Sequence, residues 1–267
     1  VGASRQLTAY YMDPRNFLDE SYIFQFLIHT YNPEEQTRDG LEAMLKGSFM
    51  DSGSQTGGNT ENSGNGSGSS GQSSTEMVVI SNEGPGDNLS LSEETAIPSE
   101  TSVSTDNNNN NNNNSAGKAG VDYVGIIMKA AEQSKQNPYV LASMILQEQG
   151  KGTSGSISGS SGYYNYFNIG AYQDGKMGAI ERGIWYAKQS GSYMRPWNNR
   201  EKSIVGGALF FTENYMNAGQ NTLYLKKWNV QGANLFKHQY MTNVQGAAEE
   251  GAKLPSAYNK DMKSKAL

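Results

Sequence analysis

A long polar stretch divides this chain into three parts. Residues 51–117 carry nine acidic and no basic residues, are rich in glycine, serine and asparagine, and include eight consecutive asparagines at 107–114. Such a composition buries too little apolar surface to offset the entropy that the chain loses on ordering. We therefore expect a disordered insertion or linker over 51–117, between an N-terminal segment over 1–50 and a folded domain over 118–267.

The aromatic residues and the charges follow the same division. The whole chain has 267 residues and a formal net charge of −5. Between 32 and 122 the only aromatic residue is Phe49, whereas 123–240 contains all three tryptophans and eleven of the sixteen tyrosines. Residues 118–267 hold seventeen basic and ten acidic residues. The acidity of the chain therefore comes mainly from the insertion, and the aromatic-rich domain is basic.

The composition excludes several kinds of site. The chain has no cysteine, which removes disulfides, thiolate nucleophiles and cysteine-ligated metals. It has two histidines, and His29 lies in an apolar run where a structural role is expected. We expect no metal and no cofactor. The sequence contains no run of about 18 apolar residues, so we expect no membrane span. No secretory segment appears at Val1. The absence of an initiator Met there favours a fragment of a longer chain.

Apolar periodicity predicts a mainly α fold. Asn137 and Pro138 form a helix start, with Asn as the N-cap and Pro at the first helical position. The pair Gly206-Gly207 would allow close packing of a later helix. Residues 221–230 are expected to form a turn and a short irregular strand. The expected helices cover 21–30, 37–46, 121–135, 138–148, 178–189 and 200–216.

Glu148 is the residue best placed for chemistry. It is the only acidic residue between Glu132 and Asp174, and it follows Met144 by four residues, on the apolar face of its helix. Burial raises the pKa of a carboxyl, and the carboxyl end of a helix disfavours negative charge. A carboxyl that stays protonated near neutral pH can donate a proton to a leaving oxygen. The alternative is a glutamate at a frayed helix end, bonded to the backbone or to Lys151.

A block of aromatic and amide residues follows at 163–172. Aromatic rings stack on sugar rings, and amides bond hydroxyl and N-acetyl groups, so this block favours a carbohydrate ligand. The alternatives are a core segment with exposed tyrosines and a single-stranded nucleic acid site. The basic residues are scattered and arginines are few, so we do not expect nucleic acid.

Several blocks in order resemble the catalytic domain of bacterial cell-wall endo-β-N-acetylglucosaminidases, the glycoside hydrolase family 73 autolysins of the clostridial and staphylococcal type. Residues 9–29 are similar to the segment that precedes that domain. Two departures stand out: Asn168 lies where many members have Gly, and Met241-Thr242-Asn243 replaces Ala-Thr-Asp. The matching blocks are Leu141-Ala142, Gln147–Thr153, Tyr164–Ala171, Lys202–Ala208, Gly219–Tyr224 and His238–Thr242.

The resemblance implies a lysozyme-like α fold, of the goose-type or transglycosylase-like kind, with a cleft. It implies cleavage of the β-1,4 bond on the reducing side of N-acetylglucosamine in peptidoglycan. Glu148 matches the general acid and Tyr240 a tyrosine near the reaction centre. The protein would be secreted, associated with the cell wall, monomeric and active in autolysis and daughter-cell separation. The candidate substrate-binding residues are Gln149, Asn165, Tyr166, Phe167, Asn168, Tyr172, Trp228 and His238.

The second catalytic group stays open at this point. Glycosidases commonly use two carboxylates, and the candidates after Glu148 are Asp174, on a predicted turn, and Glu181, on a predicted helix. For each of the two, a solvated surface charge is the favoured interpretation. In a third reading the 2-acetamido group of the substrate attacks the anomeric carbon, with Tyr240 orienting it, and His238 packs beside Tyr240.

Two other functions remain as alternatives. A lytic transglycosylase shares the fold and the single helix-end glutamate but releases 1,6-anhydro-muramoyl products. A wall-binding module without activity would keep the fold alone. In each case the basic region over 118–267 suits an anionic cell wall, with an attraction that weakens as salt increases.

Overall fold

The computed structural model describes residues 2–51, 120–232, 235–258 and 263. In these ranges the regular secondary structure is helical, and the β-type pairing consists of two isolated bridges, Thr30 with Gln136 and Gly191 with Arg195. The predicted mainly α fold is confirmed. The disorder predicted for 51–117 falls outside the described residues, apart from Asp51.

The N-terminal segment contributes α1 (Arg5–Met12), the 3-10 helices η1 (Pro14–Phe17) and η2 (Ile23–Phe26), and α2 (Arg38–Leu45). The remaining elements are α3 (Tyr123–Ser134), α4 (Pro138–Gln149), α5 (Ala179–Lys188), α6 (Arg200–Phe211), the π-helix η3 (Thr212–Met216), α7 (Leu223–Trp228), α8 (Gly246–Gly251) and the 3-10 helix η4 (Leu254–Ala257).

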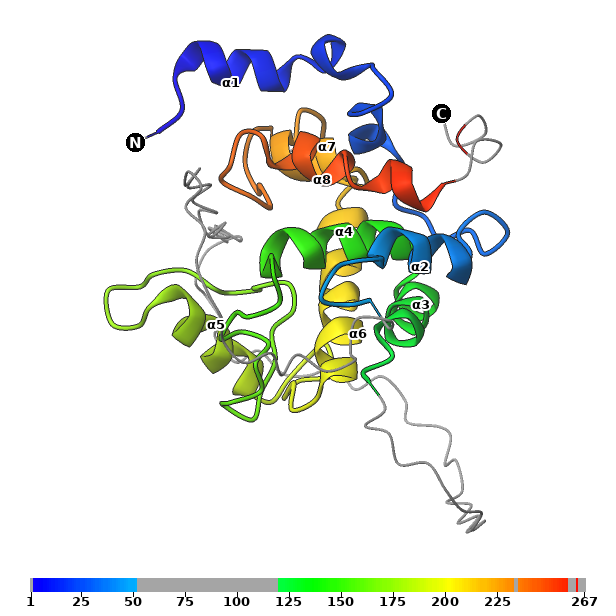
Figure 1. Cartoon of the computed structure of the whole chain (residues 1–267). Helices are drawn as coiled ribbons and strands as arrows, with labels where there is room; N and C mark the ends of the chain where they lie inside the picture. Colours follow the sequence, from blue (N-terminus) through cyan, green and yellow to red (C-terminus); the bar gives the residue numbers. More distant parts are fainter. Residues whose placement is uncertain (1, 52–119, 233–234, 259–262, 264–267) are drawn as a thin grey trace, which may run out of the picture.

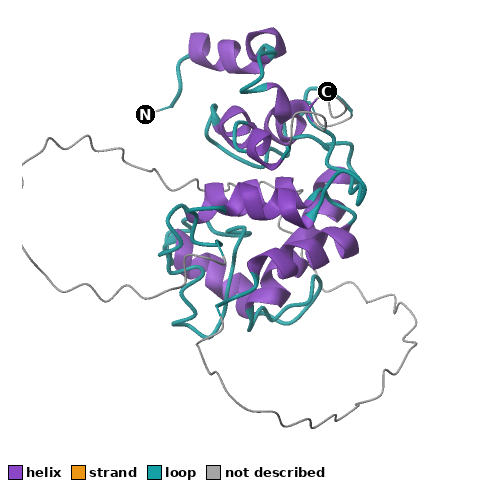
Figure 2. Ribbon diagram, turned by 45° about the vertical axis from the view of Figure 1, so that its right-hand side comes forward, coloured by secondary structure: helices purple, strands orange, loops and turns teal. Residues whose placement is uncertain are grey.

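Helix α4 lies at the centre of the molecule. The helices α7 and α8 lie on one side of it, and α3, α5 and α6 lie on the other (Figures 1 and 2). Its start is the predicted one: the side chain of Asn137 accepts a hydrogen bond from the backbone N–H of Tyr139, and Pro138 is the first helical residue. Ten of the residues in α4 are buried, so its carboxyl end also lies inside the protein.

Helix α6 packs closely because of two glycines. A methyl group at Gly206 would collide with the carbonyl oxygen of Tyr193, and one at Gly207 would collide with the ring of Phe167. The close packing expected from this pair is therefore observed. The end of α6 places Phe211 in the core.

The N-terminal segment shares the core of the rest of the protein. Phe24, Leu41 and Leu45 are buried in the same apolar cluster as α4. The hydroxyl of Tyr139 accepts a hydrogen bond from the backbone N–H of Thr37 at 2.7 Å and contacts its carbonyl oxygen at 3.1 Å. Residues far apart in sequence are thus joined next to the start of α4.

Two expected elements differ in the structure. The helix predicted over 21–30 is limited to η2, because the chain then extends and His29 exchanges backbone hydrogen bonds with Asn221 and Asn137. The strand predicted in 221–230 is wrong: Thr222 caps the short helix α7 through a hydrogen bond to the N–H of Leu225.

Three further differences concern helices. The helix predicted over 200–216 changes to a π-helix after Phe211, and α1 and α8 were not predicted. The helices predicted over 37–46, 121–135 and 178–189 are confirmed within two residues. None of the helices in the described parts of the chain is long and apolar enough to cross a membrane.

Candidate active site

Glu148 lies in the last turn of α4 with its side chain turned into the protein. The residue is 8% exposed. The helix ends at the next residue, Gln149, and Gly150 after it adopts a positive φ of 53°. Because the carbonyl groups at a helix end carry partial negative charge, this position disfavours the ionised carboxylate. The helix end and the burial therefore both oppose ionisation of the Glu148 carboxyl.

Both oxygens of the Glu148 carboxyl are held by neutral donors. The hydroxyl of Tyr240 donates to Oε1 at 3.0 Å. The side-chain amide of Asn168 donates to Oε2 at 3.0 Å and to the backbone carbonyl of Glu148 at 3.3 Å. No cation neutralises the carboxyl among these contacts. The arrangement fixes the orientation of the carboxyl inside the protein.

The pKa of Glu148 is raised to about 8. Burial is the largest cause, and the negative charge of Glu250 adds to it. The hydrogen bonds from Asn168 and Tyr240 act in the opposite direction because they stabilise the ionised form. A carboxylic acid that keeps its proton at neutral pH can serve as a general acid.

Asn168 adopts the left-handed backbone conformation, with φ of 50°. Glycine adopts this conformation without strain, and asparagine is one of the few other residues that tolerate it. The conformation therefore explains how Asn can occupy a position where Gly is common in the resembling family. Its Oδ1 atom accepts a hydrogen bond from Gln149 at 3.3 Å, and Gln149 also donates to the backbone carbonyl of Tyr166 at 2.8 Å.

Tyr240 is fully buried and is packed from several sides. Its ring lies edge to face against Phe211, with centroids 5.0 Å apart, and against Tyr215 at 6.1 Å. Its backbone N–H donates to the carbonyl of Lys226 at 2.8 Å. The ammonium of Lys227 donates to the carbonyls of Met241 and Thr242 at 2.8 and 3.2 Å. Helix α7 thus holds the segment that carries Tyr240.

His238 and Trp228 pack around this segment without contacting Glu148. The His238 ring stacks on Tyr215 with centroids 4.5 Å apart, and its Nδ1 lies 2.7 Å from Oε1 of Gln220. Trp228 is 4% exposed, at the end of α7, with the ammonium of Lys227 over its ring. In the described part of the chain, both side chains therefore pack against other residues of the protein.

Three predicted substrate-binding side chains lie in the core. Asn165 donates to the carbonyls of Ile169 and Gly183, both at 2.9 Å. Tyr166 and Phe167 are fully buried, and the hydroxyl of Tyr166 lies 2.9 Å from that of Tyr123. These side chains are enclosed by protein and have no surface at which a glycan can stack. They shape the loop that carries Asn168.

Asp174, Glu181 and Tyr172 lie around the start of α5, away from the contacts of Glu148. Asp174 accepts hydrogen bonds from the backbone N–H groups of Lys176 and Met177, which lower its pKa, and pairs with Arg182 at 3.6 Å. The Arg182 guanidinium donates to the hydroxyl of Tyr172 and lies over its ring. Glu181 is exposed in the first turn of the helix.

Known proteins were compared with this site and fold. No family model matches the chain. Bifunctional autolysins of Staphylococcus epidermidis and Staphylococcus aureus are each 37% identical to it over 144 residues, which is 49% of this chain and 10% or 11% of theirs. The chain is a homologue of these autolysins. This confirms the family resemblance seen in the sequence. The chain spans about a tenth of the length of these relatives.

Solved structures from Staphylococcus aureus were also found. Glucosaminidase B is 22% identical with a TM-score of 0.49, over 98% of this chain and 74% of that one. A catalytic mutant of Autolysin E in complex with the disaccharide NAG-NAM is 26% identical with a TM-score of 0.42, over 51% of this chain and 59% of that one.

Sequence reasoning missed the buried charges next to the site of this autolysin homologue. Lys226 and Lys227 on α7, and Glu250 on α8, are 0%, 3% and 1% exposed. Charged residues are rarely buried to this extent, so composition gave no reason to single them out. Leu223, Tyr224 and Trp228 surround the two lysines in sequence and were the one signal of a buried helix.

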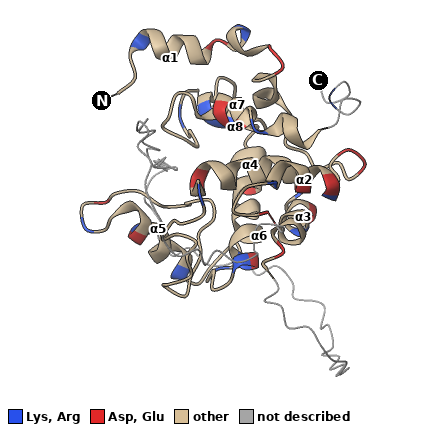
Figure 3. Cartoon of the chain, in the orientation of Figure 1, with Lys and Arg blue, Asp and Glu red and all other residues tan. Residues whose placement is uncertain are grey.

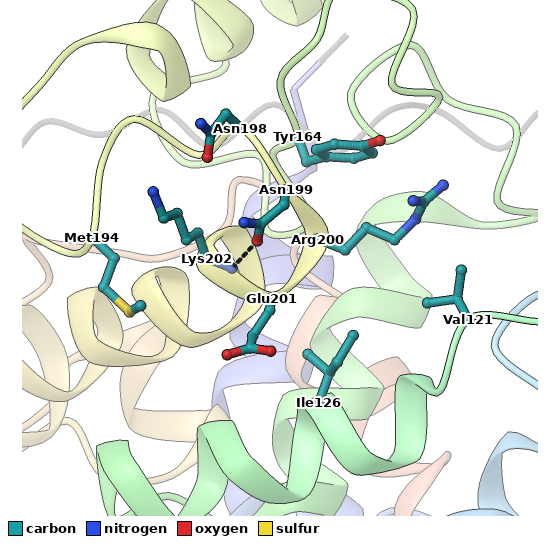
Figure 4. Close-up of a pocket in the computed structure, with 9 residues that line it drawn as sticks. All are labelled: Val121, Ile126, Tyr164, Met194, Asn198, Asn199, Arg200, Glu201 and Lys202. Atoms are coloured by element: carbon teal, nitrogen blue, oxygen red, sulfur yellow. Dashed lines mark hydrogen bonds between the residues drawn. The ribbon is translucent and has the colours of Figure 1, made fainter. Parts of the chain in front are cut away.

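A separate hollow of about 460 Å³ lies at the start of α6. Figure 4 shows that Arg200 and Lys202 project from the first turn of this helix on opposite sides. Arg200 lies over the ring of Tyr164, at 4.9 Å from its centroid. Within the described parts of the chain, no group of three or more His, Asp or Glu side chains is arranged to hold a metal ion.

Proposed function

We propose that this chain is a peptidoglycan hydrolase that cleaves the β-1,4 bond between N-acetylglucosamine and N-acetylmuramic acid, with Glu148 as the general acid. The observation that carries the proposal is the buried Glu148 carboxyl, held by Tyr240 and Asn168 with a pKa of about 8. Homology to autolysins supports peptidoglycan as the substrate class. Secretion, association with the cell wall and a part in autolysis and cell separation belong to the same proposal.

The proton of Glu148 would be transferred to the glycosidic oxygen as the bond to the anomeric carbon breaks. The carboxylate that this leaves would lie between two hydrogen-bond donors, the Tyr240 hydroxyl and the Asn168 amide. Hydrogen bonds to a charged acceptor are stronger than those to a neutral one. Both contacts therefore strengthen as the proton leaves, which favours the transition state over the ground state.

The nucleophile in this reaction would be the 2-acetamido group of the substrate. Asp174 is engaged in a turn and an ion pair, and Glu181 lies exposed on α5. Neither shares a contact with Glu148 or Tyr240 in the described structure, so neither has support as the partner carboxylate. The acetamido oxygen would attack the anomeric carbon as the glycosidic bond breaks and Glu148 gives its proton to the leaving oxygen. Water would then open the resulting oxazolinium ring, with the Glu148 carboxylate taking its proton, so that no partner carboxylate is needed.

The test uses purified peptidoglycan, the wild type, Glu148→Gln and Glu249→Gln. Glu249 is exposed on α8 and serves as the charge-matched control. Loss of the general acid is expected to lower the rate of reducing-end formation by about 10²–10⁴-fold. The control should retain the wild-type rate. If Glu148→Gln clears cell walls as fast as the wild type, the role of Glu148 is refuted and a binding module without activity is favoured.

Peptidoglycan from which the N-acetyl groups of glucosamine have been removed separates attack by the substrate acetamido group from a reaction that uses a second protein carboxylate. If the acetamido group is the nucleophile, the wild type should fail on this substrate while it still cleaves the acetylated one. Equal rates on both substrates would instead require a protein carboxylate. A product lighter by one water, with a 1,6-anhydro ring, would identify a lytic transglycosylase.

A further inference from the structure

Behind Glu148 and Tyr240 the protein buries three more ionisable side chains from three different elements. They are His29, on the extended segment after η2, Lys226 on α7 and Glu250 on α8, with exposures of 0%, 0% and 1%. Figure 3 shows that acidic and basic positions meet where α7 and α8 pack together. Burial of charge is costly, so this cluster requires an explanation beyond the stability of the fold.

Lys226 contacts Tyr240 directly, and its ammonium lies close to the helix that carries Glu148. Its backbone carbonyl accepts the N–H of Tyr240 at 2.8 Å. Its ammonium lies 3.8 Å from the sulfur of Met144, one helical turn before Glu148, and 5.0 Å from the ring of Phe211. Phe211 in turn packs edge to face on Tyr240. A change at Lys226 therefore reaches Tyr240 through the backbone and through the aromatic packing.

The polar atoms of the cluster are poorly satisfied. Glu250 Oε2 and both ring nitrogens of His29 are buried without a hydrogen-bond partner. The hydrogen-bond acceptor that the structure gives the Lys226 ammonium is a sulfur atom, which accepts weakly. In a water-poor interior, unpaired groups of this kind interact with other charges more strongly than they would at the surface.

Several ionisable groups in this region influence the pKa values of one another. Glu250 faces Lys226, Lys253 and the exposed Glu249, and burial raises its pKa to about 7. Burial lowers the pKa of Lys226 to about 7, opposed by Glu250. His29 faces Lys226 and has its pKa lowered by burial, so it is neutral. The carboxyl of Glu148 and the hydroxyl of Tyr240 both face Glu250, whose negative charge opposes the ionisation of each.

We propose that Glu250 and Lys226 are positioning residues for the general acid: Glu250, buried on α8 where this helix packs against α4, keeps the proton on Glu148, and Lys226, buried on α7, holds the backbone of Tyr240. This inference rests on the proposed function. Lys226 permits a carboxylate to exist at Glu250 by providing a positive charge nearby. The Glu250 carboxylate then makes loss of the Glu148 proton unfavourable until that proton is transferred to substrate.

The test is the pH dependence of kcat/KM on soluble peptidoglycan fragments for wild type, Glu250→Gln and Glu249→Gln. Removal of the Glu250 charge stabilises the ionised form of Glu148, so the alkaline limb of the profile should move to lower pH. The exposed control, one residue away on the same helix, should keep the wild-type limb. A merely structural role of Glu250 would lower the rate at every pH and leave the limb in place.

A second variant guards against a folding defect in Glu250→Gln. The double change Lys226→Met and Glu250→Gln removes both buried charges together and leaves neither unpaired, a replacement that proteins often tolerate. It should show the same displaced limb as Glu250→Gln, with a circular dichroism spectrum like that of the wild type. A limb at the wild-type position in this folded double variant overturns the inference.

A titration of the wild type separates this inference from the proposed function. The carboxyl carbon of Glu148, followed by NMR and assigned with Glu148→Gln, should show two inflections with pH in the wild type, because Glu148 and Glu250 titrate as a coupled pair. It should show one inflection in Glu250→Gln. A single inflection in the wild type overturns the inference even if the chain hydrolyses peptidoglycan. Two inflections in a chain that cleaves nothing would refute the proposed function alone.

Discussion

The hydroxyl of Tyr240 donates a hydrogen bond to Oε1 of Glu148 at 3.0 Å, across 92 residues of sequence. This contact lowers the pKa of Glu148, against the larger effect of burial. In Tyr240→Phe the pKa of Glu148 should therefore rise, and the alkaline limb of the pH–rate profile should move to higher pH. The rate at the optimum should fall about tenfold, because a hydrogen bond to a charged group is worth about 1.5 kcal/mol or more.

The pH–rate profile of Tyr240→Phe checks this prediction. The direction of the limb is opposite to the one expected for Glu250→Gln, so the two variants control for each other. An alkaline limb that moves to lower pH in Tyr240→Phe, or a rate equal to that of the wild type, would contradict the assigned contact.

Asn168 combines a backbone conformation with two side-chain contacts, and two variants separate them. Asn168→Gly keeps the positive φ but loses the hydrogen bonds to Glu148. Asn168→Ala loses the same bonds and is also strained, by about 1–2 kcal/mol. Both variants should lose activity to a similar extent, while the free energy of unfolding should be lower for Ala than for Gly. Urea unfolding measures this difference. Equal free energies of unfolding for the two variants would contradict the assigned backbone conformation.

The elevated pKa of Glu148 has a consequence for stability. In the unfolded chain the carboxyl has its ordinary pKa of 4.5, and in the folded protein the pKa is about 8. The contribution of Glu148 is fully present below pH 4.5 and is lost as the pH rises toward 8, at about 1.4 kcal/mol for each unit of pKa difference. Glu148→Gln cannot ionise, so it should match the wild type near pH 4.5 and be more stable near pH 8.

Urea unfolding at the two pH values measures this difference, with Glu249→Gln as the control. The buried lysines titrate in the opposite direction, but they are present in both proteins and their effect cancels in the comparison. A Glu148→Gln variant that is less stable than the wild type at pH 8 would show that the carboxyl is not held in its protonated form.

The sequence pointed to Glu148 for a physical reason that the structure supports. A single acid on the apolar face of a helix with a clear start, Asn137-Pro138, predicts burial, and Glu148 is buried. The partners of Glu148 were harder to foresee. Asn168 and Tyr240 reach it from loops whose path depends on tertiary packing, and the aromatic block around Tyr166 turned out to build the core.

The failures follow from interactions that no local pattern contains. Helix formation at 21–30 is overridden because the backbone N–H of His29 donates to the carbonyl of Asn221 and its carbonyl accepts from the N–H of Asn137. Helix α7 was missed because Lys226 and Lys227 break its apolar pattern, although both are buried. Lysines normally predict a solvent-exposed face, so their burial becomes visible only when α8 and the Tyr240 segment are in place.

Asp174 and Glu181 should be dispensable for the chemical step. Asp174 is used by backbone N–H groups and Arg182, and Glu181 is exposed. We expect Asp174→Asn and Glu181→Gln each to retain activity within about threefold of wild type, as is usual for surface substitutions. Initial rates on peptidoglycan check this. A loss of about 100-fold or more in a folded variant would instead assign that residue as the second catalytic carboxylate.

The role of Glu148 as the general acid is tested most directly by mass spectrometry of the products of purified peptidoglycan, with wild type and Glu148→Gln compared under the same conditions. We expect fragments with N-acetylglucosamine at the reducing end from the wild type, and almost none from Glu148→Gln. Reducing-end N-acetylmuramic acid, 1,6-anhydro products, or equal amounts of product from the two proteins would contradict this expectation.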